Sequence, residues 1–222
     1  MTLKEEQVVE NPRICIAIPA RLDSKRLPGK MLMQFYGKPL IRNVFDEVSS
    51  WGFDTFVVTD SDEIADVIPQ ENVRRTGEAL NGTHRIAQLD WNYDVIINVQ
   101  GDMLDITYST IEPLIDAVLY DDPFDVATVY TLGAKDSDVK VIHTNGNVHW
   151  FTRSRDISYG DRHLGVYAYK RYALDMYGDL VNNDRLEDLE QLRFCNLDFA
   201  AYETKYNGYE INTQADIDSW PL

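Results

Sequence analysis

The first half of the chain alternates short apolar runs with stretches of helical periodicity. β-Branched apolar runs at residues 14–18, 53–59 and 94–99 predict three buried strands. Between the first two, residues 40–48 repeat apolar positions at helical spacing, which predicts a helix with one buried face. A shorter run from Val73 predicts an edge strand. Strands that alternate with helices imply βαβ units, so we expect an α/β fold with a mostly parallel sheet.

The second half carries a different pattern, with short aromatic strands and little helix between them. Four such strands are predicted, at residues 125–132, 139–143, 147–153 and 164–169. Residues 184–195, DRLEDLEQLRFC, repeat apolar positions and predict a helix. A last strand is expected at 209–212. Closely spaced strands favour antiparallel pairing, so we expect an antiparallel extension that carries a second substrate.

Composition and charge exclude several classes of partner. The 222 residues carry a formal net charge of −16, which argues against duplex nucleic acid and anionic membranes, because both bind basic faces. No apolar run reaches the roughly 18 residues of a membrane span. The N-terminal residues lack the apolar core of a secretory signal. Cys15 and Cys195 have no metal-ligand spacing, so free thiols in a reducing compartment are expected.

A cationic loop follows the first strand of this acidic chain. Arg21, Lys25, Arg26 and Lys30 fall within ten residues, with Gly29 beside the last of them. Such a loop at the carboxyl edge of a parallel sheet commonly holds polyphosphate. The alternative is a surface loop whose charges pair with nearby acids, and the loop alone does not separate the two interpretations.

Two further stretches place polar groups beside elements of the predicted sheet. Asp102 comes one glycine after the strand at 94–99, where a carboxylate suits Mg²⁺, although a turn aspartate is the simpler alternative. Gln100 lies beside it. Gly82 and Thr83 open a helical pattern whose N–H groups could meet an anion or a base edge. Thr83 could equally be a plain helix cap.

Residues of the second half carry weaker signals. His163 and Tyr167 lie four apart, which in a strand places both side chains on one face, where they could line a pocket or belong to an ordinary core. Glu190 and Gln191 sit within the predicted helix, where a solvated face is the default expectation. The remaining histidines show no metal-ligand spacing, and no nucleophile-elbow motif is present.

Taken in order, the motifs resemble one known family. IPARLDSKRLPGK, GKPLI, NGTHR, NVQGD, VKV, FTR, HLGVYAY, LEDLEQLR and INT follow one another as in the 3-deoxy-manno-octulosonate cytidylyltransferases, over about residues 14–220. The resemblance implies a Rossmann-like nucleotidyltransferase fold with a small antiparallel sugar-binding and dimerisation extension. It also implies one domain over 1–222, with a nucleotide-binding half (14–124), the sugar and dimer region (125–208) and a return to the first half (209–222).

The same resemblance assigns roles to individual residues. Arg21 and Lys30 would hold the phosphates of CTP and act with Asp102 in catalysis, and Asp102 and Asn212 would hold Mg²⁺. The cytidine would lie near Gly82, Thr83 and Gln100. A second set would grip the sugar acid: Arg153, His163, Tyr167, Glu190 and Gln191. The implied reaction transfers CMP from CTP to the anomeric hydroxyl of the sugar acid, in a cytoplasmic homodimer that binds neither nucleic acid nor membrane.

The chain departs from the family pattern in three places. Asn212 stands where the family has a second metal-binding carboxylate, Met103-Leu104 replace a Glu-Pro pair, and the segment from 157 to 163 is shorter. Two alternatives therefore accompany the main hypothesis. One is a cytidylyltransferase for an 8-amino or other modified sugar acid. The other is a weakly active homologue that binds the nucleotide or the nucleotide sugar.

Overall fold

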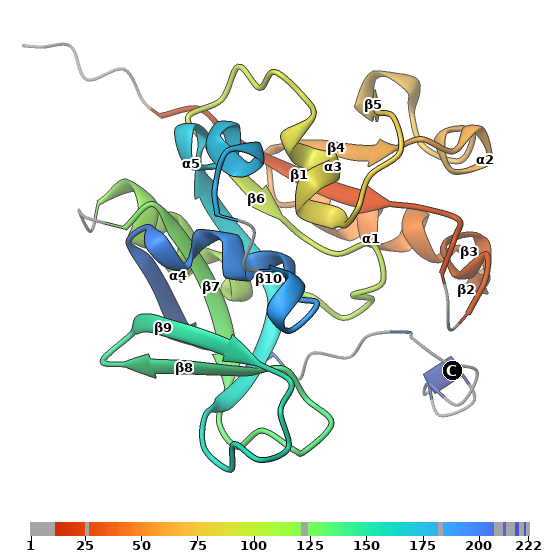
Figure 1. The fold of residues 1–222 in the computed structure, drawn as a ribbon. Coiled ribbons are helices and arrows are strands. Elements are labelled where there is room, and N and C mark those ends of the chain that lie inside the picture. Colours follow the sequence, from red (N-terminus) through yellow and green to blue (C-terminus); the bar gives the residue numbers. More distant parts are fainter. Residues whose placement is uncertain are drawn as a thin grey trace, which may run out of the picture.

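The computed structural model describes residues 12–24, 27–120, 124–181, 184–206, 211, 216, 217 and 220. Within this part of the chain, nine strands form one sheet (Figure 1). They are β1 (Ile14–Ala20), β4 (Asp54–Thr59), β5 (Val73–Arg75), β6 (Val95–Asn98), β7 (Val126–Thr131), β8 (Lys140–Thr144), β9 (Asn147–Thr152), β10 (Asp161–Lys170) and β11 (Phe199–Glu203). Their spatial order is β5-β4-β1-β6-β10-β7-β11-β9-β8. A separate pair is formed by β2 (Gln34–Phe35) and β3 (Lys38–Pro39).

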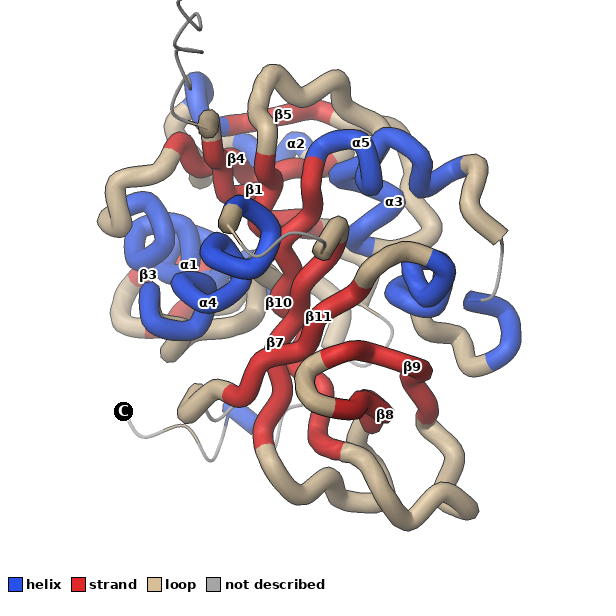
Figure 2. The backbone as a smooth tube through the Cα atoms, turned by 90° about the vertical axis from the view of Figure 1, so that its left-hand side faces the viewer, coloured by secondary structure: helices blue, strands red, loops and turns tan. Residues whose placement is uncertain are grey.

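The sheet is parallel in its first half and mixed in its second. Strands β5, β4, β1 and β6 pair in parallel, which confirms the βαβ expectation. Strand β10 then joins β6 in antiparallel fashion, with Tyr167 opposite Asn98. The antiparallel extension is therefore a continuation of the same sheet rather than a second one. Figure 2 shows β10, β7 and β11 side by side, with β8 and β9 at one end.

Helices cover both faces of this sheet. The α-helices are α1 (Leu40–Ser49), α2 (Asp62–Ala65), α3 (Gly82–Ala87), α4 (Tyr108–Leu119) and α5 (Arg171–Asp175). The 3₁₀ helices are η1 (Lys30–Leu32), η2 (Gln70–Asn72), η3 (Met176–Gly178), η4 (Asp184–Leu186) and η5 (Glu190–Asn196). No helix among the described residues is both long and apolar enough to cross a membrane.

Strand β1 shows how the sequence separates the two faces. Ile16 and Ile18 pack in the cluster that includes the apolar faces of α1 and α4. Cys15 and Ala17 pack in the opposite cluster, with residues of α3, α5 and η5. Because side chains alternate along a strand, a run that is apolar at every position is buried on both sides. Cys15 and Cys195 are free thiols, as expected.

The predicted helix at 184–195 is wrong. This segment forms η4 and η5, separated by Asp188 in a left-handed conformation (φ 55°) and an extended Leu189. The leucines at 186, 189 and 192 recur every three residues, a spacing that fits three residues per turn as well as 3.6. Leu186 is exposed whereas Leu189 and Leu192 are buried, so the segment does not bury one continuous helical face.

Strand β11 and helix α4 are among the elements that the sequence patterns did not predict. Strand β11 runs parallel to β7, although its core positions Ala200 and Ala201 give only a weak apolar signal. Helix α4 contains Pro113, which interrupts the usual helical pattern. The strand predicted at 209–212 lies outside the described residues except for Ile211.

Candidate active site

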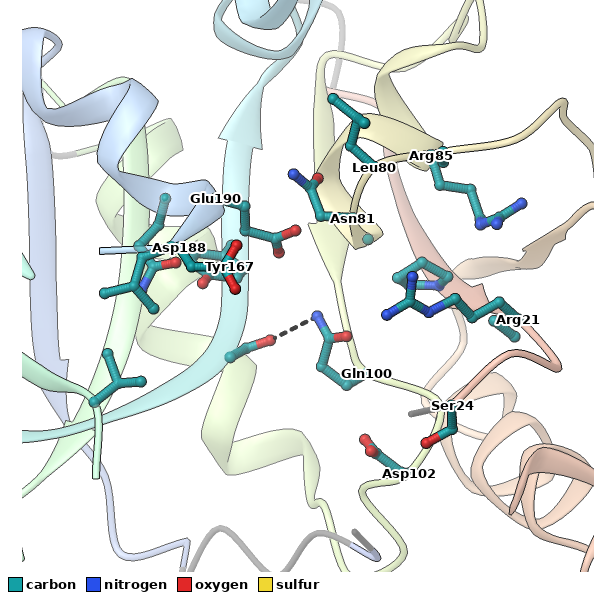
Figure 3. Close-up of a pocket in the computed structure, with 18 of the residues that line it drawn as sticks. Arg21, Ser24, Leu80, Asn81, Arg85, Gln100, Asp102, Tyr167, Asp188 and Glu190 are labelled. Atoms are coloured by element: carbon teal, nitrogen blue, oxygen red, sulfur yellow. Dashed lines mark hydrogen bonds between the residues drawn. The ribbon is translucent and has the colours of Figure 1, made fainter. Parts of the chain in front are cut away.

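A cavity of about 850 Å³ opens between the loop after β1, the start of α3, β10 and the η4–η5 segment (Figure 3). It gathers ten of the predicted site residues: Arg21, Lys30, Gly82, Gln100, Asp102, Arg153, His163, Tyr167, Glu190 and Gln191. Thr83 lies directly behind the wall, bonded to Glu190. Asn212 lies outside the described residues. Residues from both halves of the chain thus form one site.

The floor of the cavity is a buried ion pair. The Nζ atom of Lys30 donates to Oδ2 of Asp102, and both side chains are about nine-tenths buried. Lys30 also donates to the backbone oxygen of Ile211 at 3.1 Å. Gly29 has φ 70°, a left-handed conformation that turns the loop so that the next residue enters the floor. Lys30 therefore fits both interpretations of the cationic loop, since it faces the cavity and pairs with an acid.

Asp102 is the described carboxylate at the cavity floor, where it could meet a metal ion. No group of three or more histidine, cysteine or acidic side chains is arranged to hold a metal among the described residues. Magnesium is usually held by one or two carboxylates together with substrate phosphates and water. A single buried carboxylate at the floor fits that mode, in which the phosphates supply most of the ligands.

The first turn of α3 meets a carboxylate of the chain itself. Glu190 accepts from the backbone N–H of Thr83 at 3.2 Å and from its hydroxyl at 3.0 Å. Burial raises the pKa of Glu190, while these hydrogen bonds and the nearby charge of Arg21 act in the opposite direction. The side-chain oxygen of Asn81 accepts from the backbone N–H of His84 at 2.7 Å and thereby caps the helix. The alternative assignment of Thr83 as the cap is therefore wrong.

A β-bulge in β10 faces the middle of the cavity. Against β7 the register shifts between Leu164 and Tyr167, so two extra residues fit into β10. The carbonyl oxygen of Gly165, one of these two, accepts from Nε2 of Gln100 at 3.1 Å (Figure 3). The rings of His163 and Tyr167 lie 5.5 Å apart on the cavity wall, as expected for residues on one face.

His163 is a neutral imidazole inside this wall. Burial, with a smaller contribution from the charge of Arg153, lowers its pKa to about 3. Its Nε2 lies 3.0 Å from Oγ1 of Thr128, and its Nδ1 lies 3.4 Å from the amide nitrogen of Gln191. A neutral ring can hold neighbouring groups by hydrogen bonds but brings no charge to an anionic ligand.

Glu187 holds together the wall of the cavity that is formed by the end of β9 and the η4–η5 segment. Its two carboxylate oxygens accept from the hydroxyl of Thr152 at 2.7 Å and from the backbone N–H of Arg153 at 2.9 Å. This clamp ties the η4–η5 segment to the end of β9 and places the exposed side chain of Arg153 at the cavity. Arg153 and the residues of η5 therefore belong to one hydrogen-bonded wall.

Sequence reasoning missed six polar residues of the cavity lining: Ser24, Asn81, Arg85, Arg185, Asp188 and Arg193. Arg85 is buried and pairs with Asp60 at 2.9 Å. Arg193 donates to the backbone oxygen of Tyr177 at 3.2 Å. Arg185, Asp188 and Arg193 lie in or beside the motif LEDLEQLR, so the motif was the available signal. The wrongly predicted helix would have left them on a solvated face.

The lining is cationic although the chain is acidic. Among the described residues, six cationic side chains line the cavity against three carboxylates. In a chain of net charge −16, a local excess of positive charge attracts anionic ligands to this cavity. The site is suited to a ligand, or a pair of ligands, that carries several negative charges.

Comparison with known proteins agrees with this arrangement. A family described as cytidylyltransferase matches residues 14–210. The 3-deoxy-manno-octulosonate cytidylyltransferase of Francisella tularensis subsp. holarctica (strain LVS) is 34% identical, over 94% of this chain and 92% of the relative. A second protein of that name (numbered 2), from Hydrogenovibrio crunogenus, is 35% identical over 91% and 94%.

A solved structure is similar over the same extent. It is named as CMP:2-keto-3-deoxy-manno-octonic acid synthetase complexed with CTP, and it superposes with a TM-score of 0.85 at 29% identity, over 93% of this chain and 95% of that one. The 4-diphosphocytidyl-2C-methyl-D-erythritol synthase of Anaerococcus prevotii shares the fold at 18% identity, with a TM-score of 0.62. The chain belongs to the family of 3-deoxy-manno-octulosonate cytidylyltransferases.

Proposed function

We propose that this protein transfers CMP from CTP to the anomeric hydroxyl of 3-deoxy-D-manno-octulosonate (Kdo), giving CMP-Kdo and pyrophosphate. The observation that carries the proposal is the cationic cavity, which combines the loop after β1 with the wall built from β9, β10 and η5. Both substrates are anions, so one cavity with an excess of cationic side chains suits the pair. The relatives described above carry the name of this activity.

At the phosphate end the protein supplies charge and position. Arg21 and Lys30 would bind the triphosphate of CTP, and Gln100, held by Gly165, would lie near the cytidine together with Gly82. The sugar hydroxyl attacks the α-phosphorus and releases its proton to solvent water, while the bond between the α-phosphorus and the bridging oxygen breaks and pyrophosphate leaves. Positioning and charge neutralisation are the main contributions that a protein makes to such a step.

Asp102 would hold Mg²⁺ together with phosphate oxygens of the substrate. The floor fits this role because Asp102 offers a carboxylate that Lys30 already holds in place. When bound, the metal offsets negative charge at the α-phosphate. Asn212, which follows Ile211 in the sequence, would offer a neutral amide oxygen as a further ligand.

At the other end, Arg153 would pair with the carboxylate of the sugar acid. A guanidinium and a carboxylate form two parallel charge-assisted hydrogen bonds, which fix both distance and direction. The neutral His163, together with Tyr167, Glu190 and Gln191, would contact the uncharged part of the sugar. This division places the anionic groups on cations and the hydroxyl groups on neutral or accepting side chains.

The test is pyrophosphate release from CTP, with Mg²⁺ present, across a panel of Kdo, its 8-amino analogue and other sugar acids. We expect release with Kdo and little release without a sugar acid. Preference for the 8-amino sugar would replace Kdo with the modified substrate. CTP binding without release for any sugar acid would instead identify a nucleotide-binding homologue.

We also propose that the protein acts as a cytoplasmic homodimer. The exposed side chains of Leu132 and Tyr159, next to the paired ends of β7 and β10, support self-association through the antiparallel region. Sedimentation of the wild type and of Leu132→Asp measures this directly. The two free thiols support a reducing compartment.

A further inference from the structure

We propose that Thr128 is a positioning residue of the sugar wall. Its hydroxyl fixes the tautomer of His163, and the histidine in turn fixes which end of the Gln191 amide faces the ligand. Thr128 lies in β7 behind the wall and is not among the residues that line the cavity. Thr128, His163 and Gln191 form a hydrogen-bonded series, of which only His163 and Gln191 border the cavity.

The hydroxyl of Thr128 can donate its single proton to only one of its neighbours. Oγ1 lies 2.7 Å from the carbonyl oxygen of Val166 and 3.3 Å from that of Leu164. Carbonyl oxygens only accept, and the hydroxyl has one proton, so Thr128 donates to the bulge of β10. If the proton pointed at His163 instead, two oxygens 2.7 Å apart would face each other without a proton between them.

The direction of the Thr128 hydroxyl determines the tautomer of His163. Since the Thr128 proton is committed to Val166, its oxygen meets Nε2 of His163 at 3.0 Å as an acceptor. Nε2 must then carry the ring proton. The ring is neutral, so Nδ1 has a free lone pair and accepts.

The tautomer of His163 in turn determines the orientation of the Gln191 amide. Its Nε2 lies 3.4 Å from Nδ1 of His163, and only the amide N–H₂ can donate to that lone pair. The carbonyl oxygen Oε1 is therefore the end of the amide left for the cavity. With the other tautomer, Nδ1–H would require the oxygen, and the N–H₂ group would face the ligand instead.

The hydrogen bonds that link Thr128, His163 and Gln191 have a chemical consequence, which rests on the proposed function. A side chain that presents only an accepting oxygen favours a hydroxyl group of the sugar and disfavours its carboxylate. Gln191 would thus select the hydroxyl-bearing part of the sugar acid, opposite the guanidinium that selects its carboxylate. The bulge of β10 serves both substrates, because Gly165 holds Gln100 while Val166 holds Thr128.

The tautomer is measured by long-range ¹⁵N–¹H correlation spectra of histidine-labelled protein near pH 7.5. The protein has four histidines, and the signals of His163 are those that are missing from the spectrum of His163→Gln. We expect the wild type to show only the Nε2–H form of His163 and Thr128→Ser to keep it. Thr128→Val should populate the Nδ1–H form. An Nδ1–H wild type, or Thr128→Val with the Nε2–H form alone, would overturn the proposal.

Kinetics supply the second measurement on the same proteins. Thr128→Val should raise KM for the sugar acid about tenfold, as expected for one misdirected hydrogen bond, with KM for CTP within about twofold of wild type. Thr55→Val is the matched control, since it removes a buried hydroxyl that donates to Phe53 O at 3.1 Å, away from the cavity. Equal losses for both substrates, or no rescue by Thr128→Ser, would show that Thr128 is structural.

The wild-type spectrum decides the tautomer even if Thr128→Val does not fold. It also separates this proposal from the proposed function, because the spectrum needs neither CTP nor sugar. A wild type without turnover but with the Nε2–H form would overturn the function and leave the role of Thr128 in the wall supported.

Discussion

The two ends of the cavity are built in different ways. The end proposed to bind the phosphates, here called the phosphate end, lies on loops that directly follow parallel strands. Its groups include the exposed Arg21 and the Lys30–Asp102 pair. The opposite end is a wall of buried hydrogen bonds, in which the neutral His163 joins β7, β10 and η5. One end offers charged groups, and the other offers directed hydrogen bonds.

The contrast predicts different responses to substitution. Charge acts over distance, so the phosphate end should tolerate small displacements but not the loss of a cation. Directed hydrogen bonds fail when a donor and an acceptor are exchanged, even if no volume changes. Substitutions at each end can therefore separate the two ends or show that they act as one.

The largest effect is expected at the buried ion pair. Lys30→Met keeps most of the side-chain volume but leaves the buried carboxylate of Asp102 without its cation, which should cost about 3–5 kcal/mol of unfolding free energy. The value of kcat/KM for CTP should fall at least about 100-fold, because a phosphate contact is lost as well. Urea unfolding and CTP titration measure the two effects.

The double variant Lys30→Met/Asp102→Asn serves as its control. Removing the stranded charge should recover most of the stability and none of the CTP affinity. If CTP affinity returns together with stability, Lys30 is a structural residue and the phosphate end must be assigned elsewhere.

The next largest effects are expected at Arg21 and Arg153, which should each affect the KM of a different substrate. Arg21→Ala should raise KM for CTP, and Arg153→Ala should raise KM for the sugar acid, each about 10- to 100-fold and each with little change for the other substrate. Arg153→Lys should not restore the sugar KM, because an ammonium lacks the planar fork of a guanidinium. Crossed or equal losses in steady-state kinetics would contradict the division of the cavity.

A smaller effect appears in the pH dependence of stability. The pKa of His163 is lowered to about 3, so below its ordinary value of about 6.5 the unfolded chain binds a proton there and the folded chain does not. Stability should therefore fall with pH from about 6.5 downward, by about 1.4 kcal/mol per pH unit from this group. His163→Gln should remove this contribution in unfolding curves at about pH 7.5 and 4.5.

His149→Gln is the matched control, because it changes an exposed histidine of the same sheet. It should keep the wild-type difference between the two pH values. If both variants keep it, His163 is accessible to protons and the wall is less closed than its contacts indicate.

The smallest effect is expected at Asn212. Its neighbour Ile211 accepts from Lys30 and donates its N–H to the backbone oxygen of Asp102 at 3.3 Å, so the chain enters the floor at this point. Asn212→Asp should lower the Mg²⁺ concentration for half-maximal rate a few-fold, since magnesium favours carboxylates. A curve of rate against Mg²⁺ that does not move, or moves to higher Mg²⁺, would show that Asn212 is no metal ligand.

Local patterns predicted much of the fold. A β-branched apolar run identified β1, and helical periodicity identified α1, because both signals come from neighbouring residues. The same reasoning failed where the signal was weak or ambiguous. The three-residue spacing of leucines at 186–192 fits two kinds of helix, and Ala200 and Ala201 carry little apolar signal for β11.

The sequence by itself determined the family, the strand-and-loop order of the phosphate end, and the identities of the residues that carry charge. These properties depend on residue type and short spacing. Only the tertiary structure decided that β10 joins β6 in antiparallel fashion and carries a bulge there. The bulge and the order of the strands bring Thr128, His163 and Gln191 into one hydrogen-bonded chain. Its direction depends on which carbonyl oxygen faces which hydroxyl, and contacts between residues so far apart in sequence leave no local pattern.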